Sequence, residues 1–328
     1  MKDIAAALQL SKTTISWILS GKGEEKKFSE ATIKRVKDYA ERINYHPNLL
    51  ARSLSLGTTN TVGLIIPFID DTFYAQIAQS IEVEAEKRNY LLTVCSSDGN
   101  SYHEIDLIRI LRSKQVDGLI IAPTKNSIQE IKRLKHDGFP FVLIDRYFPE
   151  INTNYIVVDN EDSSFQLINV LIKKGCKKIA LLTSDLHLLV MGLRLKGYKK
   201  ALKKANIPCN NDLIIQVQRN DYKKDIIKQL DALFKKHRDI DGFYFTTHYL
   251  AIEAIRYFLS RGINYNKHFR LACFHETEAL DILAPKMIVA RMPVNDIGKK
   301  AMDILLDNIT QKTTLPKSMV LTNELTNL

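Results

Sequence analysis

From Thr61 to the end of the chain, short apolar stretches alternate with longer amphipathic ones, and this alternation restricts the possible folds more than any other feature. The first apolar stretch, 62–66, is interrupted only by one glycine and ends at Pro67. Apolar strands separated by helices are typical of parallel sheets that are covered on both faces. The pattern occurs in two sets of roughly 100–130 residues, each the size of one doubly wound lobe. We therefore expect two α/β lobes with a ligand site in the cleft between them, at the carboxyl ends of the strands.

The expected elements of these lobes follow from hydrophobic periodicity. Strands are expected at about 62–66, 91–95, 117–122, 140–144, 155–158, 178–183, 213–217, 242–246, 270–274 and 287–291. Helices are expected at about 73–89, 104–114, 128–136, 162–174, 194–205, 223–235, 249–261 and 295–308.

The first sixty residues differ from the rest in charge and in pattern. They contain ten Lys or Arg and six Asp or Glu, so they are denser in positive charge than the remainder of a chain whose net charge is +10. Their periodicity predicts short helices at 2–8, 12–19 and 30–43, joined by polar turns. Small and polar residues at 57–60 favour a turn and predict the boundary of this segment.

Helices 2–8 and 12–19 have the spacing of a helix-turn-helix, because a short turn joins them and the second has a polar outer face. Ser11 is a suitable N-cap for the second helix. Hydroxyl groups donate to phosphates, lysine reaches a phosphate or a guanine edge, and a helix N-terminus favours an anion. The pattern therefore suits DNA. The alternative is that three small helices pack a mini-core and that the polar face is merely solvated.

Specific strings resemble the LacI/GalR family of bacterial transcription regulators. In the first segment they are KDIA at 2–5, LSKTTIS at 10–16, LSG at 19–21, SEAT at 29–32, NYHPN at 44–48 and ARSL at 51–54. In the rest of the chain they are VDGLI at 116–120, VLIDR at 142–146, VDN at 158–160, RLKGY at 194–198 and FTT at 245–247. One departure is the loop at 23–28, which is a few residues longer than is usual in the family.

The resemblance implies a small all-α helix-turn-helix DNA-binding domain plus an α/β periplasmic-binding-protein-like core of two doubly wound lobes. The DNA-binding domain would be 1–46, the hinge helix and linker 47–60, and the effector-binding core 61–328. Three crossovers near 160, 290 and 318 would divide the core. Lobe one would be 61–160 plus 291–318, and lobe two 161–290 plus 319–328.

The resemblance also implies DNA-binding residues. Lys12, Thr13 and Trp17 are expected to read bases, and Ser11, Thr14 and Ser16 to contact phosphates. Trp17 is unusual because indole has one donor and cannot pair bidentately with guanine; its alternative is packing on helix 30–43. In the hinge the expected contacts are Asn48, Ala51, Arg52 and Leu54, with Leu54 as the leucine that wedges between base pairs.

The effector-binding residues implied by the resemblance are Phe73, Asp145, Arg146, Arg194, Thr247, His248 and His275. His248 and His275 stand where sugar-binding relatives usually have Asp. Protonated imidazoles beside arginines suit an anion, so a sugar acid or a sugar phosphate is expected, with affinity falling as pH rises through about 6.5. The alternative is that one histidine is structural and that Glu276 replaces the missing aspartate.

Other classes of function lack the residues they need. The sequence has no dinucleotide fingerprint, no P-loop, no GxSxG and no CxxC pair, so we expect no enzyme, cofactor or metal. No run of about 18 apolar residues and no signal-peptide pattern is present, so we expect a cytoplasmic protein without a membrane partner. The expected function is that of a homodimeric repressor-type regulator that binds a palindromic double-stranded DNA operator and is controlled by a small carbohydrate-like effector. The alternative is a periplasmic-type carbohydrate-binding protein without DNA function.

Overall fold

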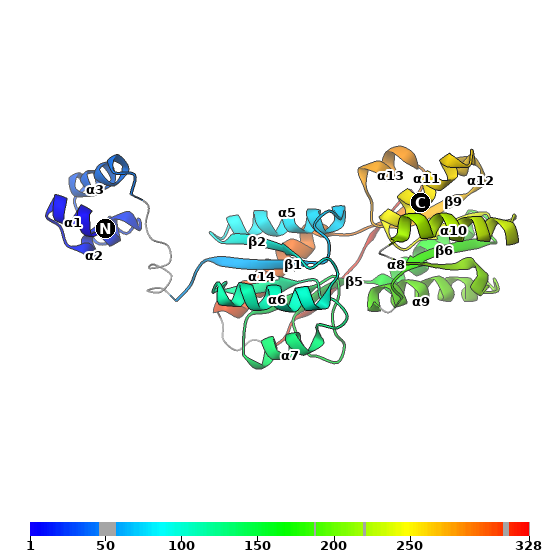
Figure 1. Cartoon of the computed structure of the whole chain (residues 1–328), viewed down its shortest axis with the longest axis horizontal. Coiled ribbons are helices and arrows are strands. Elements are labelled where there is room, and N and C mark those ends of the chain that lie inside the picture. Colours follow the sequence, from blue (N-terminus) through cyan, green and yellow to red (C-terminus); the bar gives the residue numbers. More distant parts are fainter. Residues whose placement is uncertain (46–56, 187, 219–220, 311–314, 328) are drawn as a thin grey trace. The chain divides into compact units, whose positions relative to one another are not determined.

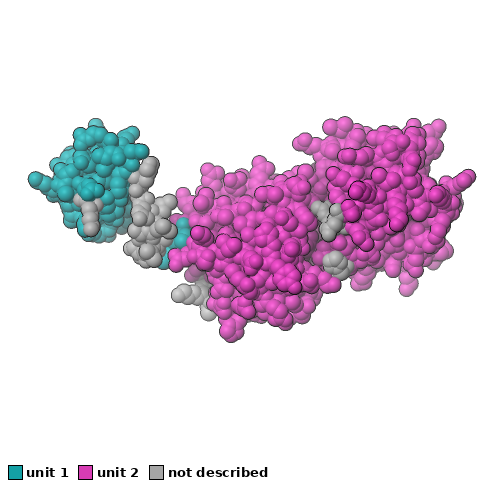
Figure 2. All heavy atoms as spheres, viewed as in Figure 1, with its two compact units in different colours: residues 1–59 teal, residues 60–328 magenta. Residues whose placement is uncertain are grey.

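The computed structural model describes residues 1–45, 57–186, 188–218, 221–310 and 315–327. The chain divides into two compact units, Met1–Thr59 and Asn60–Leu328, which Figure 2 colours separately. Most of the expected hinge, and with it Asn48, Ala51, Arg52 and Leu54, lies outside the described residues.

The first unit is all-helical, with α1 (Lys2–Leu8), α2 (Lys12–Leu19) and α3 (Glu30–Arg42). Its small core contains Ile4, Ile15, Ile18 and Val36, all at most 1% exposed. Ser11 caps α2, because its hydroxyl accepts the backbone N–H of Thr14 at 3.0 Å. Ser29 caps α3 in the same way through Thr32. The helix-turn-helix predicted from the sequence is therefore present, and it has its own core.

The second unit contains two six-stranded sheets, one in each lobe (Figure 1). The strands of lobe one are all parallel, in the order β11-β5-β4-β3-β1-β2. They are β1 (Thr61–Ile66), β2 (Leu91–Ser96), β3 (Gly118–Ile121), β4 (Phe141–Ile144), β5 (Tyr155–Val158) and β11 (Ser318–Leu321). Helices α5 (Thr72–Glu86) and α14 (Val294–Thr310) pack on one face, and α6 (Ser101–Ser113) and α7 (Ile128–His136) on the other.

Lobe two repeats this plan, with the order β12-β10-β9-β8-β6-β7 and only β12 antiparallel to its neighbour. Its strands are β6 (Ile179–Ser184), β7 (Ile214–Val217), β8 (Gly242–Phe245), β9 (Arg270–Phe274), β10 (Ile288–Arg291) and β12 (Glu324–Thr326). Helices α8 (Asn160–Lys173) and α9 (Leu189–Lys204) cover one face, and α10 (Tyr222–Lys236) and α11 (His248–Ser260) the other. Two short helices, α12 (Tyr265–His268) and α13 (Glu278–Leu283), and a 3-10 turn at Asn211–Leu213 were not expected from the sequence.

Three segments connect the lobes. The first joins β5 to α8 at Asp159, and the second joins β10 to α14 after Arg291. The third lies between β11 and β12, at 322–323. The sequence placed this last crossover near 318, which is too early: 318–321 pair with 155–158 in the sheet of lobe one. Residues 319–321 therefore belong to lobe one.

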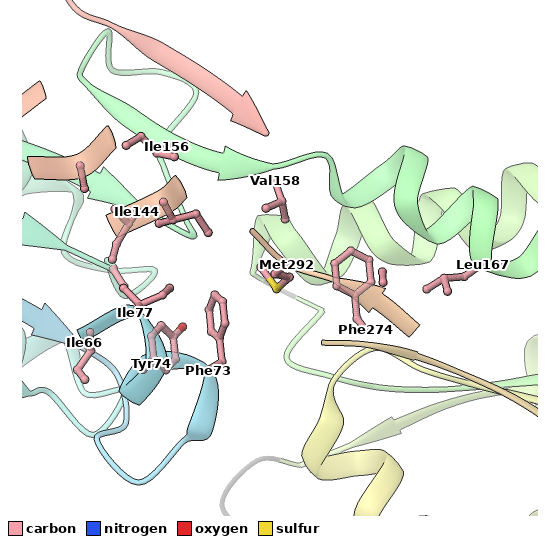
Figure 3. Packing of buried hydrophobic residues seen from close by; sticks show 14 of the residues in the cluster. Ile66, Phe73, Tyr74, Ile77, Ile144, Ile156, Val158, Leu167, Phe274 and Met292 are labelled. Atoms are coloured by element: carbon pink, nitrogen blue, oxygen red, sulfur yellow. The ribbon is translucent and has the colours of Figure 1, made fainter. Parts of the chain in front are cut away.

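The facing layers of the two lobes share one apolar cluster (Figure 3). Phe73 and Tyr74 of α5 enter it from lobe one, and Phe274 at the end of β9 enters it from lobe two. Met292 and Val158, at two of the connections, lie between them. The first two crossovers therefore pack in the core that joins the lobes, close to the strand ends where a ligand site is expected.

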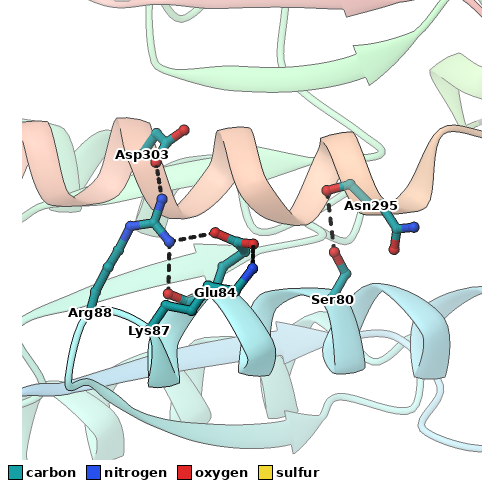
Figure 4. Close-up of polar contacts among 6 residues, drawn as sticks. All are labelled: Ser80, Glu84, Lys87, Arg88, Asn295 and Asp303. Atoms are coloured by element: carbon teal, nitrogen blue, oxygen red, sulfur yellow. Dashed lines mark hydrogen bonds and ion pairs between the residues drawn. The ribbon is translucent and has the colours of Figure 1, made fainter.

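In each lobe, two helices on the same face of the sheet pack closely where a glycine of one contacts a serine of the other. In lobe one a Cβ on Gly298 of α14 would come within 2.7 Å of the Ser80 Cβ, and the Ser80 hydroxyl donates to the carbonyl of Asn295 at 3.3 Å. In Figure 4, Arg88, two residues after α5, also pairs with Asp303 of α14. In lobe two a Cβ on Gly197 of α9 would come within 2.7 Å of the Ser164 Cβ of α8. Helices this close leave no room for a larger side chain.

Candidate functional site

The outer face of α2 carries the polar residues that the sequence assigned to DNA. Ile15 and Ile18 point into the core, so the opposite side of the helix is left to solvent. Lys12, Thr13 and Trp17 are exposed, and Thr14 and Ser16 are half-buried. The hydroxyls of Ser11 and Thr14 lie 2.8 Å apart, so each satisfies part of the other's hydrogen-bonding capacity. The helix N-terminus and its side chains thus form one compact polar surface.

Trp17 packs on the loop that precedes α3. Its ring centroid lies 6.2 Å from that of Phe28, and the ammonium of Lys26 lies 5.5 Å from the ring centre. The side chain remains 38% exposed. The alternative derived from the sequence, packing on helix 30–43, therefore has the wrong main partner, because the ring rests on the loop at 23–28.

In the second unit, a cavity lies between the lobes at the carboxyl ends of the strands. All seven residues that the sequence proposed for the effector line it. Lobe one contributes Phe73, Asp145 and Arg146, and lobe two contributes Arg194, Thr247, His248 and His275. Residues separated by up to 202 positions in the chain are therefore brought together, because both sheets end at this cleft.

On the side of lobe one, Asp145, Tyr74 and Arg146 form a buried polar cluster. The Tyr74 hydroxyl donates to Asp145 Oδ2 at 2.7 Å, and Arg146 Nη2 donates to the Tyr74 oxygen at 3.2 Å. Arg146 Nε lies 3.3 Å from Asp145 Oδ2. Burial, together with the Asp145 charge, raises the pKa of Tyr74 well above its usual value, so Tyr74 acts as a donor. Burial alone would lower the pKa of Arg146, but the negative charges around it raise it, and Arg146 stays cationic.

On the side of lobe two, Arg194 is held rigidly. Its Nε donates to Asn160 Oδ1 at 2.7 Å, and its Nη1 donates to the carbonyl of Thr246 at 2.5 Å. The guanidinium also stacks on Phe274, with 3.7 Å between its central carbon and the ring centre. Because the side chain is only 5% exposed, burial lowers its pKa from the ordinary arginine value. Arg194 is thus a positioned donor in the wall of the cavity.

The two histidines have different surroundings. His275 is 4% exposed, and its Nδ1 has no hydrogen-bond partner in the part of the chain that the structure describes. Burial, aided by the nearby His248 and Arg194, lowers the pKa of His275 to about 3. The prediction that His275 is protonated near neutral pH is therefore wrong. The predicted loss of effector affinity as pH rises through about 6.5 is also wrong as far as it depended on the titration of His275. Its uncharged ring instead offers one nitrogen to the cavity.

His248 joins the lobes. Its Nε2 lies 3.3 Å from the Thr72 hydroxyl and 3.6 Å from Asp71 Oδ1, both at the start of α5 in lobe one. Its ring centre is 5.1 Å from that of His275, which in turn meets Phe73 edge-on at 5.0 Å. These contacts cross the cleft beside the cavity.

Asp145 and His275 hold equivalent places in the two lobes. Each is the residue that follows its strand, β4 or β9, and each has a positive φ, 61° and 71°. Each also donates its backbone N–H to the neighbouring strand, Asp145 to Ile156 and His275 to Ala290. Left-handed backbone is costly for residues other than glycine and is concentrated at functional sites. In each lobe, the same left-handed backbone conformation after a strand thus places one polar side chain in the wall of the cavity.

The sequence did not predict several residues that line the cavity, and Glu276, proposed as a replacement for the missing aspartate, does not line it. Glu276 pairs with Arg291 at 2.6 Å and is absent from the residues that line the cavity, so it does not replace the missing aspartate. The lining residues not foreseen are Phe68, Asp71, Tyr74, Ser184, Asp185, Leu188, Val190, Met191, Tyr249, Phe274 and Met292. Asp71, Ser184 and Asp185 had a usable signal, since they follow or end apolar strands that point at the cleft.

Two further features bear on the class of protein. Within the described residues, no group of three or more His, Cys, Asp or Glu is placed to hold a metal ion. None of the described helices combines the length and the apolar character required to cross a bilayer.

Similarity to known proteins extends over the whole chain. Residues 59–327 match the family described as periplasmic binding proteins and sugar binding domain of LacI family, and residues 1–48 match bacterial regulatory proteins, lacI family. The chain is 30% identical over 316 residues to the HTH-type transcriptional regulator RegA of Clostridium acetobutylicum, covering 95% of this chain and 92% of the relative. It is 29% identical over 313 residues to catabolite control protein A of Priestia megaterium, with coverage of 95% and 92%.

Solved structures show the same fold. The transcriptional regulator CelR in complex with cellobiose has a TM-score of 0.73 at 22% identity, covering 98% of this chain and 96% of that one. The Cra transcriptional dual regulator of Pseudomonas putida in complex with fructose 1-phosphate has a TM-score of 0.72 at 22% identity, with coverage of 81% and 97%. RegA, CelR and Cra are each named as transcriptional regulators. With its helix-turn-helix unit and its two-lobed core, the chain belongs to the LacI family of bacterial transcriptional regulators.

Proposed function

We propose that this regulator is a homodimeric repressor that binds a palindromic DNA operator and whose operator affinity is set by a small carbohydrate-like effector. The observation that carries the proposal is the cavity between the lobes, which is lined by polar and aromatic residues from both of them. Small-molecule sites combine apolar and aromatic walls with a few positioned polar groups, as this cavity does. A ligand there touches both lobes, so it binds one lobe arrangement better than another and can shift operator affinity by that difference. A regulator of this kind acts in the cytoplasm.

For the effector we favour a neutral sugar over a sugar acid or a sugar phosphate. The cavity contains three formal negative charges, Asp71, Asp145 and Asp185, and two positive ones, Arg146 and Arg194. His275 is uncharged at neutral pH, which removes one of the cations on which an anionic ligand would depend. Carboxylates accept hydrogen bonds from hydroxyl groups, and the arginines donate to ring or hydroxyl oxygens. Of the two relatives solved with sugar ligands, CelR holds a neutral sugar and Cra a sugar phosphate.

The exposed edge of lobe one supports a homodimer. β2 is an edge strand of its sheet. Leu91 on β2 is 66% exposed, Val83 on α5 is 44% exposed and Ile110 on α6 is 50% exposed. An open strand edge flanked by apolar side chains is a surface that proteins normally cover. A second copy would cover it, and the resulting two-fold symmetry favours a palindromic operator with half-sites one or more helical turns apart.

The decisive test is a gel shift with DNA from upstream of the genes next to this one, with and without a panel of sugars. We expect a shifted complex whose stability changes with one sugar and falls with salt. Isothermal titration with that sugar, its uronic acid and its phosphate then tests the effector chemistry, and the neutral sugar should bind tightest. Sugar binding without any DNA complex would favour a periplasmic-type binding protein instead.

A further inference from the structure

We propose that residues 22–28, called here the lysine loop, bind DNA phosphates beside α2, with Lys26 held for this purpose on the ring of Trp17. The inference rests on the proposed DNA binding of the first unit and adds a contact that the helix-turn-helix alone does not supply. Its support comes from how the loop is built, from its contact with Trp17 and from its charges.

The lysine loop is a closed, hydrogen-bonded turn. The backbone N–H of Lys22 donates to the Trp17 carbonyl at 2.9 Å, and that of Lys26 donates to the Lys22 carbonyl at 3.0 Å. At the far end, the N–H of Phe28 donates to the Gly23 carbonyl at 3.0 Å. Gly23 is buried, and a Cβ there would come within 2.9 Å of Ile33 Cδ1, so the loop lies tightly against α3. A loop fixed in this way presents its side chains in one arrangement.

Trp17 and Phe28 anchor the loop to the helix that enters the groove. Their ring centroids are 6.2 Å apart, and Phe28 packs on the small core of the unit. The Lys26 ammonium lies 5.5 Å from the centre of the Trp17 ring, within the range of a cation–π contact. Trp17 lies sixth in α2, where the family resemblance places base reading, yet its indole has a single donor. Lys26 brings three donors and a full charge to that place.

The charges of the loop favour a polyanion. Lys22, Lys26 and Lys27 are all exposed, against Glu24 and Glu25. The Lys26–Glu25 pair, at 3.6 Å and exposed on both sides, is weak and does not hold the ammonium away from a stronger anion. Lysine on a loop beside a recognition helix binds phosphate oxygens as a point charge, and such phosphate contacts carry no sequence information. We therefore assign the three lysines to the DNA backbone.

The test measures salt dependence with the full-length protein and a fluorescent 30-base-pair duplex of arbitrary sequence. Each phosphate that the protein no longer neutralises lowers the steepness of log K against log salt by about 0.9. K22Q/K26Q/K27Q should lower it by two to three, equally on this duplex and on operator DNA. The matched control K199Q/K203Q/K204Q removes the same charge from exposed lysines of the core and should leave the slope unchanged. E24Q/E25Q should act in the opposite sense and tighten binding.

Trp17 provides a second readout, because it is the only tryptophan of the chain. W17A keeps all three lysines but removes the ring under Lys26, so it should lower the salt slope by about one. A hydrophobic contact between Trp17 and a base would instead lower affinity without changing the slope. In the free protein, K26Q should alter Trp17 emission while K22Q does not, which verifies the contact even if the triple variant folds poorly.

The outcomes separate this inference from the proposed function. Wild-type binding with the predicted drop in slope supports both. Wild-type binding with an unchanged slope in the triple variant, or with an equal drop in the core control, overturns the role of the lysine loop and leaves the regulator function intact. Failure of the wild type to bind any duplex at 50 mM salt overturns both.

Discussion

At the scale of single residues, His275 shows how the two lobes together set a chemical state. Its backbone belongs to lobe two, but the pKa of its ring is lowered by burial in the joint cavity and by the nearby charges of His248 and Arg194. The sequence identified His275, directly after Phe274, as a residue of the cleft. It could not indicate the protonation state, because that state depends on Phe73, contributed by the other lobe about 200 positions away, and on the closure of the cleft around the ring.

We predict that His275 makes the core less stable in mild acid. The folded pKa is about 3 and the unfolded value about 6.5, so below pH 6.5 the unfolded state binds the extra proton and stability falls, whereas above pH 6.5 the effect is absent. Between pH 7.5 and 5.5 this residue should cost about 1 kcal/mol. His275→Asn tolerates the positive φ and removes the titration. Urea unfolding of the wild type and of His275→Asn at pH 7.5 and pH 5.5 gives the free energy of unfolding of each. An equal decrease in this free energy in the two proteins would contradict a buried, neutral His275.

A second prediction separates base reading from phosphate contact on α2. Thr13 is exposed, whereas the Thr14 hydroxyl is bonded to Ser11 at the helix start. Thr13→Ala should reduce the preference for operator over scrambled DNA, and Thr14→Ala should weaken both alike. Competition titrations with the two duplexes give the ratio. If Thr13→Ala loses affinity equally on both, the assignment of Thr13 to a base is wrong.

At the scale of elements, helix and strand boundaries were predicted correctly where a polar cap or a clear apolar stripe marks them. Where these signals are absent, the predicted boundaries were wrong. α2 was predicted at its observed bounds, because Ser11 caps it and a clear apolar stripe fills it. α9 begins at Leu189, five residues before the expected start, since its N-cap is Leu188 and offers no side-chain cap to signal it. The switch between β11 and β12 was misplaced because two short strands, each with exposed residues, follow one another without a glycine or proline between them.

The helix pairs of the lobes give a prediction that a single helix can test. An added Cβ at Gly197 of α9 would overlap the Glu161 carbonyl oxygen and press on Ser164, so Gly197→Ala should destabilise lobe two by about 1–3 kcal/mol or more. Gly192 lies on the same helix, where the nearest atom to an added Cβ is the Leu186 oxygen at 3.8 Å. Gly192→Ala should therefore be neutral or stabilise by up to about 1 kcal/mol. Thermal melts of the two variants measure the difference; similar melting temperatures would contradict the close packing of α8 on α9.

At the scale of the whole molecule, the apolar clusters show which parts of the chain pack as one body and which have a core of their own. The first unit has a core of its own, separate from the clusters of the second. The facing layers of the two lobes, by contrast, share one cluster that includes Val158 and Met292, so a change in the lobe arrangement alters the packing at these two connections. The overall plan was predictable from the alternation of strands and helices, whereas this shared packing depends on Met292 and Val158, which look like ordinary strand-end residues in the sequence.

The last prediction concerns the coupling between the cavity and DNA. If a sugar changes operator affinity by some factor, bound operator must change sugar affinity by the same factor, because the two binding steps close one thermodynamic cycle. A factor of roughly 5–150 is typical of such coupling. The two titrations, sugar into protein with and without operator and operator into protein with and without sugar, should agree. A protein truncated to residues 60–328 is the control: its sugar affinity should be insensitive to DNA. A factor of one in both titrations would mean that sugar binding and operator binding are not coupled, and the proposed control of operator affinity by the sugar would then be wrong.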